Sequence, residues 1–369
     1  MLSSIKTAIF GKAPPAPKIK KPLAVENDVA LSPWLDKIGR MKFEGRYQKL
    51  VREARAIGQS NQPMLLGPWL SEVGFEVLYW IPMLRFLAKQ GSWRPENFWT
   101  LTRGGAAVWY NGLANHGIEI FELVSPSEFK AMNERRWQLA NGGQKQKHVS
   151  EIDQAILNLA REKIGHETTL FHPKEMYQNA KYFWNGTLGL KWLEEITDYS
   201  PFESLAKPPG LSLPDDYFCV KFYFNASFPE TAENKAFCAD LIRQLAKKKP
   251  VVLLTTALDV DDHRELDAEC QHDTIRVDVS GDPANNLAVQ TAILSNSAGF
   301  YGTYGGFSYL PMFYNVPSTA FVSDVSLTMP LHHAAALHAS TRLRFEHGYA
   351  RSIFRLEEVS AHNPLWSLR

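Results

Sequence analysis

A glycine-rich segment, Gly302-Thr303-Tyr304-Gly305-Gly306-Phe307-Ser308, has the composition of a ligand-binding turn. It follows a short apolar run and precedes residues with helical spacing, so we expect it to join a strand to a helix. Glycines let the backbone approach a ligand closely, and the first N–H groups of a helix attract phosphate. The hydroxyls of Thr303, Tyr304 and Ser308 would add donors. The alternative is a tight structural turn that Ser308 caps.

Lys221 interrupts the apolar run Tyr217 to Phe224, near the expected carboxyl end of a strand. Burying an ammonium group without a partner is costly, so the sequence predicts an anion beside it. That anion is either a ligand phosphate or a structural carboxylate such as Asp240 or Asp278. We favour the phosphate.

Two polar pairs accompany Lys221 in the same half of the chain. Tyr223 and Asn225 continue its strand end, where they would line the same pocket. Asp282 and Asn285 precede an apolar helical stretch and are typical helix-start residues. The same loop would also face a nucleotide across a crevice, so we keep a base or ribose contact as the second interpretation.

The segment Gly67 to Glu76 links another short apolar run to a helix and contains two acids. Glu72 and Glu76 are four residues apart, so both can lie on one face of the first helical turn. Acids stabilise a helix N-terminus there, but one of them could instead be a general base that deprotonates a hydroxyl. We assign that catalytic role to Glu72, because Gly74 beside it would admit a substrate, and a structural role to Glu76.

Arg103-Gly104-Gly105 ends the next expected strand, and Trp109 and Tyr110 follow about one helical turn later. The planar guanidinium of Arg103 suits a phosphate or a carboxylate. Aromatic faces suit the apolar face of a sugar ring. We therefore group Gly74, Arg103, Gly104, Trp109 and Tyr110 as an acceptor-binding set, with a surface arginine and core aromatics as the alternative.

The sequence gives little support to a metal or cofactor site. Asp259-Val260-Asp261-Asp262 has a DxD spacing, but these acids also open an expected helix. His332, His333 and His338 lack the i,i+4 spacing of a HExxH motif, and no GxSxG or Walker sequence is present. We predict neither a metal nor a cofactor.

These candidate residues require a particular order of elements. Apolar runs at 64–66, 98–101 and 118–123, with helices near 75 and at 106–116, predict a parallel sheet with crossover helices. A second series has strands at 217–224, 251–255, 274–279, 299–302 and 318–322 and helices at 233–249, 285–294 and 307–314. Residues 127–200 are expected to be mainly helical.

The fold class is therefore α/β, with two Rossmann-like domains facing each other across a cleft. We divide the chain into a basic tail with lead-in helices (1–58), a first Rossmann-like domain with a helical insertion (59–205), a second Rossmann-like domain (206–330) and a C-terminal helical segment (331–369). The last segment is expected to pack back on the first domain. A proline-rich stretch within 202–214 serves as the linker.

Composition narrows the partners and the compartment. Forty basic residues oppose 39 acidic ones, so the net charge of +1 argues against a nucleic-acid-binding protein. Cys219, Cys238 and Cys270 form no CxxC pair and no disulfide framework, which fits the cytoplasm. The N-terminal tail has five lysines before its first acid. It is either a mobile tail or a contact with an anionic membrane surface through Ile5, Ile9 and Phe10, at the inner face.

The stretch NNLAVQTAILSNSAGFYGTYGGFSYLPMFYNVPSTAF resembles the donor-binding half of GT-B glycosyltransferases. The segments GPWLSEVGFEVLYWIP and LTRGGAAVWY resemble the acceptor half of uncharacterised bacterial proteins of surface-polysaccharide assembly. The resemblance covers roughly residues 60–130 and 215–325. It implies that residues 59–205 form the acceptor domain and residues 206–330 the nucleotide-sugar donor domain. Glu72 would then be the base that deprotonates the acceptor hydroxyl, and the turn 302–308 and Lys221 would bind the phosphates of the donor. The chain departs from the heptosyltransferase pattern at Tyr304, where an acid is expected.

The resemblance thus implies a metal-independent glycosyltransferase that moves a sugar from a nucleotide-diphospho-sugar to a carbohydrate or glycolipid acceptor. Two rival hypotheses stay open at this point. One is a nucleotide-sugar epimerase, which would need no acceptor. The other is a non-catalytic subunit of a polysaccharide assembly complex, which would keep the fold without turnover.

Overall fold

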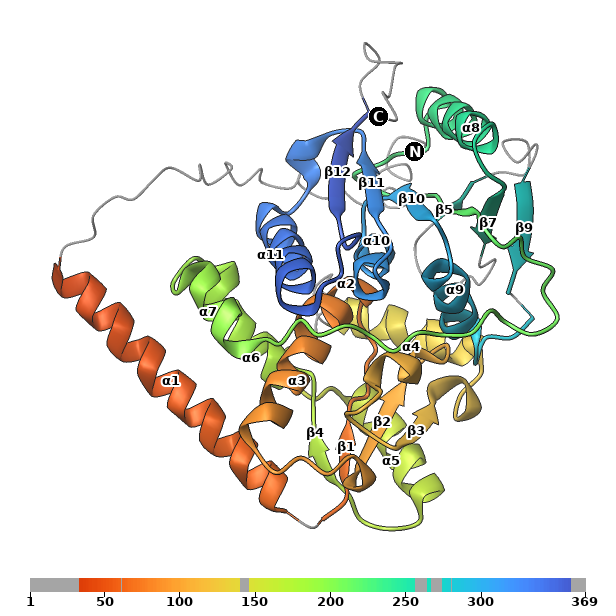
Figure 1. Ribbon diagram of the computed structural model, residues 1–369. Helices are drawn as coiled ribbons and strands as arrows, with labels where there is room; N and C mark the ends of the chain where they lie inside the picture. The colour runs from red at the N-terminus through yellow and green to blue at the C-terminus, as the bar shows by residue number, and fades with distance from the viewer. Residues whose placement is uncertain are drawn as a thin grey trace, which may run out of the picture.

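The computed structural model describes residues 33–60, 62–139, 146–255, 264–266, 274–279 and 281–359. They form two fully parallel sheets of different size, stacked one above the other in Figure 1. The expectation of an α/β protein with two Rossmann-like halves is confirmed by this arrangement.

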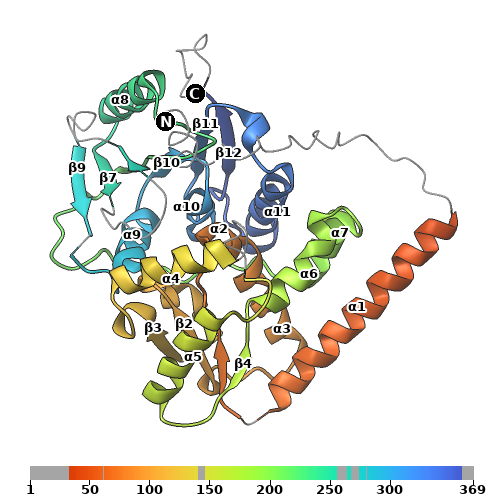
Figure 2. The ribbon, with the colours of Figure 1, turned by 180° about the vertical axis from the view of Figure 1, so that it is seen from behind.

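The first sheet has the strand order β3-β2-β1-β4. Its strands are β1 (Met64–Leu66), β2 (Phe98–Thr102), β3 (His116–Glu119) and β4 (Thr169–Phe171). Side chains alternate across a strand, so Leu65 packs with α4 (Pro126–Leu139) and α5 (Glu151–Ile164). Met64 and Leu66 point to the opposite face, toward α3 (Ile81–Gln90). Figure 2 shows α4 and α5 in front of the sheet.

The second sheet has the strand order β12-β11-β10-β5-β7-β9. Its strands are β5 (Phe218–Lys221), β7 (Val251–Thr255), β9 (Thr274–Asp278), β10 (Gly299–Thr303), β11 (Ser318–Val322) and β12 (Phe354–Glu358). Read in chain order, the strands begin at the centre with β5, move to one side through β7 and β9, and return to the other side with β10. This is the strand order of the doubly wound dinucleotide-binding fold.

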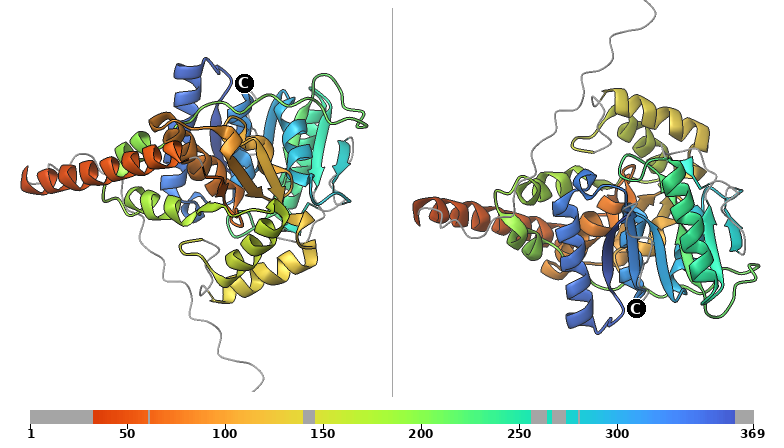
Figure 3. Two further views of the ribbon diagram at one scale, coloured as in Figure 1. Left: turned by 90° about the horizontal axis from the view of Figure 1, so that it is seen from below. Right: turned by 90° about the horizontal axis from the view of Figure 1, so that it is seen from above.

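Helices cover both faces of the second sheet. Val220 and Leu253 pack with α8 (Ala232–Ala246) on one face. Cys219 and Val252 point to the other face, which α9 (Asn286–Ser295), α10 (Gly306–Tyr309) and α11 (Pro330–His347) cover. The remaining elements are α1 (Pro33–Gln59), α2 (Val73–Phe75), α6 (Lys174–Trp184), α7 (Gly189–Ile196) and the short antiparallel pair β6 (Tyr223–Phe224) and β8 (Arg264–Glu265). Figure 3 shows that α1 projects away from the other helices.

The two halves are in direct backbone contact. A side chain placed on Gly306 would collide with the backbone nitrogen of Gly74, and a Cβ on Gly74 would lie 3.0 Å from the Cα of Gly306. Because only glycine permits this approach, α2 of the first half lies against α10 of the second, as Figures 1 and 2 both show. The main hydrophobic core is also continuous: it includes residues of both sheets and the buried face of α11.

Several expected elements differ from those observed. Residues 127–200 contain β4, which joins the first sheet, in addition to helices. The helix expected at 106–116 is a single 3₁₀ segment, Ala106–Tyr110, and the strand expected at 118–123 begins at His116 instead. The helix expected at 307–314 consists of the four-residue α10 and a 3₁₀ segment, Pro311–Tyr314. Pro311 lies at the point where α10 gives way to the 3₁₀ segment, and the other segments are short, so tertiary contacts outweigh their local preferences.

The C-terminal segment 331–369 is also more than helical. The helix α11 lies beside α7, and the Tyr79 hydroxyl of the first half is 2.6 Å from Nδ1 of His332. The chain then returns to the second sheet, where β12 pairs with β11. The second sheet therefore extends well beyond residue 330.

Three sequence-based hypotheses lie outside the described residues: the basic tail with Ile5, Ile9 and Phe10, the DxD segment 259–262, and Cys270. Cys219 and Cys238 are both buried. Within the described part of the chain, no helix combines the length and the apolar character that a membrane crossing requires.

Candidate functional site

The second sheet has one topological switch point, between β5 and β10. The strands that follow β5 lie on one side of it, and β10, β11 and β12 lie on the other. Ligands of parallel α/β sheets bind outside the carboxyl ends of the strands at such a point. Lys221 is the last residue of β5 and is paired in register with Gly302 of β10. The predicted lysine and the predicted glycine-rich turn therefore flank the switch point together.

Lys221 is nine-tenths buried and lies among polar groups of α9. Its Nζ donates a hydrogen bond to Oε1 of Gln290 at 2.8 Å and lies 5.4 Å from the centre of the Phe307 ring. The carboxamide of Gln290 in turn bonds to Asn286, whose own Nδ2 is buried and has no hydrogen-bond partner in the described part of the chain. Asp240, one of the two structural carboxylates considered for Lys221, pairs with Arg243 on α8.

The turn 302–308 is tightly packed against the end of β5. Thr303 Oγ1 accepts a hydrogen bond from the backbone N–H of Tyr223 and donates one to its carbonyl. A side chain on Gly305 would collide with the Tyr223 hydroxyl, and Ser308 Oγ donates to the Gly305 carbonyl. Thr303 and Ser308 are therefore used within the turn, as the structural alternative for Ser308 anticipated. Gly305 and Gly306 are the partly exposed residues of its backbone.

Tyr304 points into the protein and does not present its ring at the surface of the turn. Burial raises the pKa of its phenol, although hydrogen bonds with Tyr309 and with the Met329 backbone oppose that shift. Tyr304 is 9% exposed, and its ring packs edge-on against Tyr309 at 6.0 Å. Tyr304 therefore stabilises the turn by packing in the protein interior.

Glu72 lies across the interface from this turn. It is exposed, it precedes α2, and its side chain makes no capping hydrogen bond to that helix. Gly74, two residues later, is the residue in contact with Gly306. The loop that carries the predicted base and the predicted phosphate turn thus come from different sheets and touch.

The loop before Glu72 is held by side chains from three other elements. Arg103 Nη2 donates to the Ser71 carbonyl at 3.2 Å, and Arg136 Nη2 donates to the Leu70 carbonyl at 2.6 Å. The Ser71 hydroxyl lies 2.9 Å from the Tyr177 hydroxyl. Arg103 is buried, so the surface-arginine alternative does not describe it.

Glu76 lies in the core of the first half and not on the exposed loop that carries Glu72. It is 1% exposed and accepts a 2.6 Å hydrogen bond from the Tyr110 hydroxyl. Burial raises its pKa from 4.5 to about 8, against the opposing influence of the Tyr110 hydrogen bond and of Arg103. The carboxyl is therefore mainly protonated at neutral pH, which fits the structural role assigned to it.

Trp109 and Tyr110 do not fit the acceptor-binding set. Both are fully buried, and Trp109 Nε1 donates to the Thr291 hydroxyl of α9 at 3.2 Å. Their rings fill the space between the two halves, so no face is available to a sugar. They are the core aromatics of the alternative interpretation.

Gly104 also differs from its predicted acceptor role. The N–H groups of Gly104 and Gly105 both donate at 2.8 Å to the carboxylate of Glu119, so this anion-binding turn is filled by the protein itself. A Cβ on Gly104 would lie 3.0 Å from Leu287, and its carbonyl accepts from the Ala288 N–H. Gly104 is a contact between the halves.

Three further predicted pocket residues stabilise local turns. Asn225 Oδ1 accepts hydrogen bonds from the backbone of Ser227 and Phe228, so it organises the turn after β6. Asp282 accepts from both the backbone and the side chain of Asn285, just before α9. Asp282 and Asn285 are exposed, and these bonds close the turn before α9; the Asn285 side chain makes no capping hydrogen bond to that helix.

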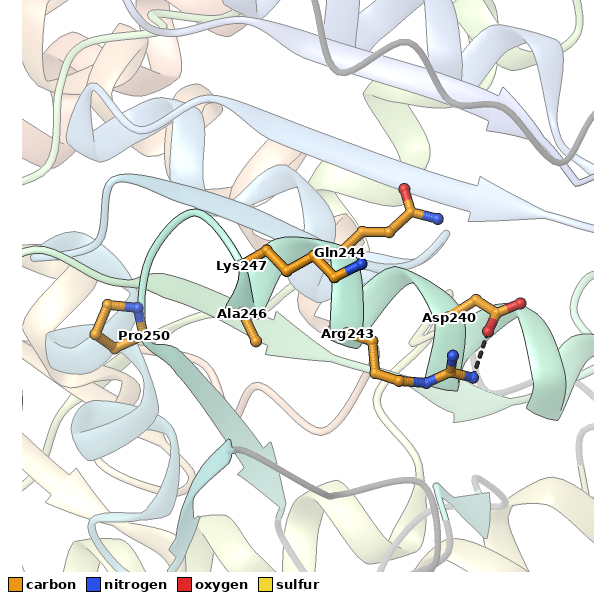
Figure 4. Close-up of a pocket in the computed structure, with 6 residues that line it drawn as sticks. All are labelled: Asp240, Arg243, Gln244, Ala246, Lys247 and Pro250. Carbon is orange, nitrogen blue, oxygen red and sulfur yellow. Dashed lines mark hydrogen bonds and ion pairs between the residues drawn. The ribbon is translucent and has the colours of Figure 1, made fainter.

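A separate pocket lies away from this interface, on the outer side of the second half. It is lined by Asp240, Arg243, Gln244, Ala246, Lys247 and Pro250. Figure 4 shows these residues along α8 and the turn that follows it. No group of three or more His, Cys, Asp or Glu among the described residues is arranged to hold a metal ion.

Sequence reasoning missed four residues that the structure brings to the site. Asn286 and Gln290 join Lys221, and Arg136 and Tyr177 join the Glu72 loop. Asn286 and Gln290 were detectable, because they are polar residues four apart in the otherwise apolar NLAVQTAILS helix. Arg136 and Tyr177 carry no such signal, since only tertiary contacts bring them to the loop.

Comparisons with known proteins complete this description. No model of a protein family matches the sequence, and no curated protein matches it. Among solved structures, the chain is similar to the ADP-heptose lipopolysaccharide heptosyltransferase II of Escherichia coli, with 14% identity, a TM-score of 0.38 and coverage of 81% of this chain and 91% of that one. It is also similar to a family 9 glycosyltransferase of Veillonella parvula, with 13% identity, a TM-score of 0.38 and coverage of 71% and 80%.

A third similar structure is a UDP-N-acetylglucosamine 2-epimerase of Listeria monocytogenes, described as putative, with 10% identity, a TM-score of 0.30 and coverage of 79% and 91%. Both enzyme classes considered from the sequence thus occur among these structures. At such identities and TM-scores the similarity carries no argument about activity. The two parallel sheets and the residues at their facing ends are the basis for assigning a function.

Proposed function

We propose that this protein is a glycosyltransferase that moves a sugar from a nucleotide-diphospho-sugar to a carbohydrate or glycolipid acceptor. One observation carries the proposal. The switch point of the second sheet, with Lys221 and the turn 302–308, lies against the loop that presents Glu72 from the first sheet. A cationic group suited to a diphosphate and an exposed acid suited to an acceptor hydroxyl therefore occupy opposite sides of one interface.

In the proposed reaction, the donor diphosphate lies at the carboxyl ends of β5 and β10. Lys221 stabilises the negative charge that develops on the leaving diphosphate, and such electrostatic stabilisation is commonly the largest catalytic contribution. The partly exposed backbone of Gly305 and Gly306 lies beside this position. Since α10 has only four residues, its dipole adds little, and Lys221 carries most of this role.

Glu72 takes the proton from the acceptor hydroxyl. The acceptor oxygen then forms a bond to the anomeric carbon, the bond from that carbon to the diphosphate oxygen breaks, and the nucleoside diphosphate leaves with the electron pair. The general base contributes about 10²–10⁴-fold to such a step. Because Lys221 supplies positive charge at the diphosphate, we expect transfer without a divalent metal.

The cellular role belongs to the same proposal. An acceptor in bacterial surface-polysaccharide synthesis is supported by the resemblance of the segments around Glu72 and Arg103. The basic N-terminal tail would then hold the enzyme at the anionic inner membrane surface, near a glycolipid acceptor.

The donor site is tested by thermal shift with UDP, GDP, ADP, CMP and TDP, each with and without magnesium. We expect one nucleotide to raise the melting temperature regardless of metal. Lys221→Met should weaken binding of that nucleotide about 10- to 100-fold, because a hydrogen bond to a charged group is lost. Lys247→Met is the matched control, since Lys247 is exposed on α8 and should bind like wild type. A chain that responds to none of these nucleotides contradicts the donor site.

The role of Glu72 is tested by Glu72→Gln. We expect the release of nucleoside diphosphate from the matching nucleotide-sugar, in the presence of acceptor, to fall about 100-fold or more, while nucleotide affinity stays unchanged. The amide keeps the size of the side chain but accepts no proton. Glu203→Gln, at another exposed acid, is the control. Full turnover by Glu72→Gln would exclude Glu72 as the base.

A further inference from the structure

Arg136 of α4 is a buried arginine with unused hydrogen-bonding groups. It is 6% exposed, and its Nη2 donates to the Leu70 carbonyl at 2.6 Å. Its Nε and Nη1 are buried and have no hydrogen-bond partner among the residues that the structure describes. Burial of an incompletely paired guanidinium is costly, so this position is expected to have a second, anionic partner.

Arg136 lies at the switch point of the first sheet. There β1 is followed by β2 on one side and has β4 on the other. The loop after β1 carries Leu70 and Ser71, and Tyr177 of α6, which follows β4, brings its hydroxyl to the Ser71 hydroxyl. Parallel α/β sheets bind ligands at this position. The first sheet thus has its own candidate ligand position, separate from Lys221.

Two guanidinium groups converge on this loop. Arg103 and Arg136 donate to the adjacent carbonyls of Ser71 and Leu70. Burial lowers the pKa of Arg136, Asp153 opposes that shift, and the charge of Arg103 adds to it. The carboxylate of Asp153 is already occupied, because it accepts hydrogen bonds from Ser150 at 2.7 and 2.6 Å and from Gln146 at 2.9 Å.

Two other acids of the first half have pKa values raised by burial. Glu76, which interacts with Arg103, is largely protonated at neutral pH because burial raises its pKa to about 8. Glu119 has its pKa raised by burial to about 7 and is bonded to Gly104 and Gly105. Asp153 is thus the ionised acid that acts on Arg136, and its oxygens accept hydrogen bonds from Ser150 and Gln146.

Tyr177 connects this position to the proposed base. Burial raises the pKa of its phenol, the Ser71 hydrogen bond lowers it, the charge of Glu72 raises it, and that of Arg136 lowers it. The hydrogen bonds place both residues at the same short loop, because Arg136 bonds to the Leu70 carbonyl, Tyr177 contacts the Ser71 hydroxyl, and Glu72 is the next residue in the chain. An acceptor whose reactive hydroxyl meets Glu72 would place a neighbouring substituent near Arg136.

We propose that Arg136, supported by Arg103, binds an oxyanion of the acceptor, a carboxylate or a phosphate, and thereby selects acidic acceptors. That the bound anion belongs to an acceptor rests on the proposed glycosyl transfer. The anion site itself does not depend on that function. An arginine fork suits the two oxygens of either group. Because Arg136 is 6% exposed, an anion that reaches it has to displace part of its present surroundings.

The test uses isothermal titration of the full chain, in a buffer without phosphate or carboxylate, with glucuronate, glucose 6-phosphate and glucose. We expect an anionic sugar to bind about tenfold or more tightly than glucose, in line with a charge-assisted hydrogen bond. Preference for glucuronate identifies a carboxylate acceptor, and preference for glucose 6-phosphate identifies a phosphorylated one. Equal affinity of the wild-type protein for all three sugars overturns the proposal, whatever the fate of any variant.

Variants of α4 locate the effect. Arg136→Gln should abolish the preference, and Arg136→Lys should restore part of it. Arg135→Gln is the matched control, since Arg135 is exposed on the same helix and pairs with Glu151 at 2.6 Å. An Arg136→Gln protein that keeps the preference overturns the assignment to Arg136.

Nucleotide binding, measured on the same samples, separates the two proposals. Normal nucleotide binding without anion preference removes the acceptor subsite and leaves glycosyl transfer standing. Anion preference without any nucleotide binding removes glycosyl transfer and leaves the anion site standing.

Discussion

At the scale of single residues, Glu72 and Glu76 show how two similar acids take different roles. They are four residues apart, yet Glu72 is exposed, whereas Glu76 is buried and bonded to Tyr110. Between them the chain enters α2, and a buried five-residue π-helical turn, Glu76–Trp80, follows it. Glu72 is open to solvent and to a substrate hydroxyl, while loss of hydration raises the pKa of Glu76 and keeps that carboxyl neutral.

Glu76 makes stability depend on pH. Its pKa is raised from 4.5 to about 8, so the folded state binds more protons than the unfolded state between these values. The free energy of unfolding should therefore fall as pH rises from about 4.5 to about 8, by on the order of a few kcal/mol. Glu76→Gln keeps an acceptor for Tyr110 and should flatten this decline. Urea unfolding at pH 5, 6.5 and 8 measures it, and an unchanged slope in the variant would contradict the assignment.

Glu119 also contributes to the pH dependence of the free energy of unfolding. Burial raises its pKa to about 7, so it contributes a decline of the same sign over an overlapping range. Some slope should therefore remain in Glu76→Gln. The double variant Glu76→Gln, Glu119→Gln should be flatter than either single variant.

At the scale of elements, glycine determines how closely the two halves approach. Gly306 at the start of α10 lies against Gly74 of α2, and Gly104 and Gly105 lie against α9. The contact between Gly306 and Gly74 is one of backbone against backbone, which cannot yield by a change of rotamer, whereas Gly104 and Gly105 lie closest to the side chains of Leu287 and Ala288. The site depends on them, because they bring the Glu72 loop and the turn after β10 together.

Gly306→Ala should destabilise the protein by about 1–3 kcal/mol, since its Cβ would collide with the Gly74 backbone. Gly45→Ala is the control: no atom lies within 4 Å of a Cβ at this position in α1, so alanine should be neutral or stabilising by up to about 1 kcal/mol. Thermal denaturation of both variants checks the prediction. Equal stability of Gly306→Ala and wild type would show that α2 and α10 are not in this contact in solution.

At the scale of the whole molecule, the two sheets share one core. Residues of β1, β5, α9 and α11 belong to the same hydrophobic cluster, and α11 crosses back to contact Tyr79 through His332 before β12 completes the second sheet. The halves are therefore coupled by packing and not only by the linker around residues 202–214.

A shared core predicts cooperative unfolding. Nine of the ten tryptophans precede residue 200, so tryptophan fluorescence reports mainly on the first half, whereas far-UV circular dichroism reports on both. We expect the two signals to give coincident denaturation curves. Separate transitions would show that the halves unfold independently.

The sequence by itself determined the regular elements and the two strand ends that matter most. Long apolar runs such as VVLLT and NLAVQTAILS predict β7 and α9 within one residue of the observed bounds, because their hydrophobic pattern is strong. Lys221 and the turn 302–308 could be placed together because the parallel strands of one sheet present their carboxyl ends at the same edge.

Only the tertiary structure decided which polar residues face a ligand. Tyr110, Trp109 and Gly104 looked like an acceptor site and proved to be core and interface residues, whereas Arg136 and Tyr177 come to the Glu72 loop from elements 60 or more residues away. Burial and long-range pairing depend on how the two halves pack. The hydrophobic periodicity of a single segment does not determine that packing. The same limit explains β4 and β12, whose pairing partners precede them by more than 30 residues.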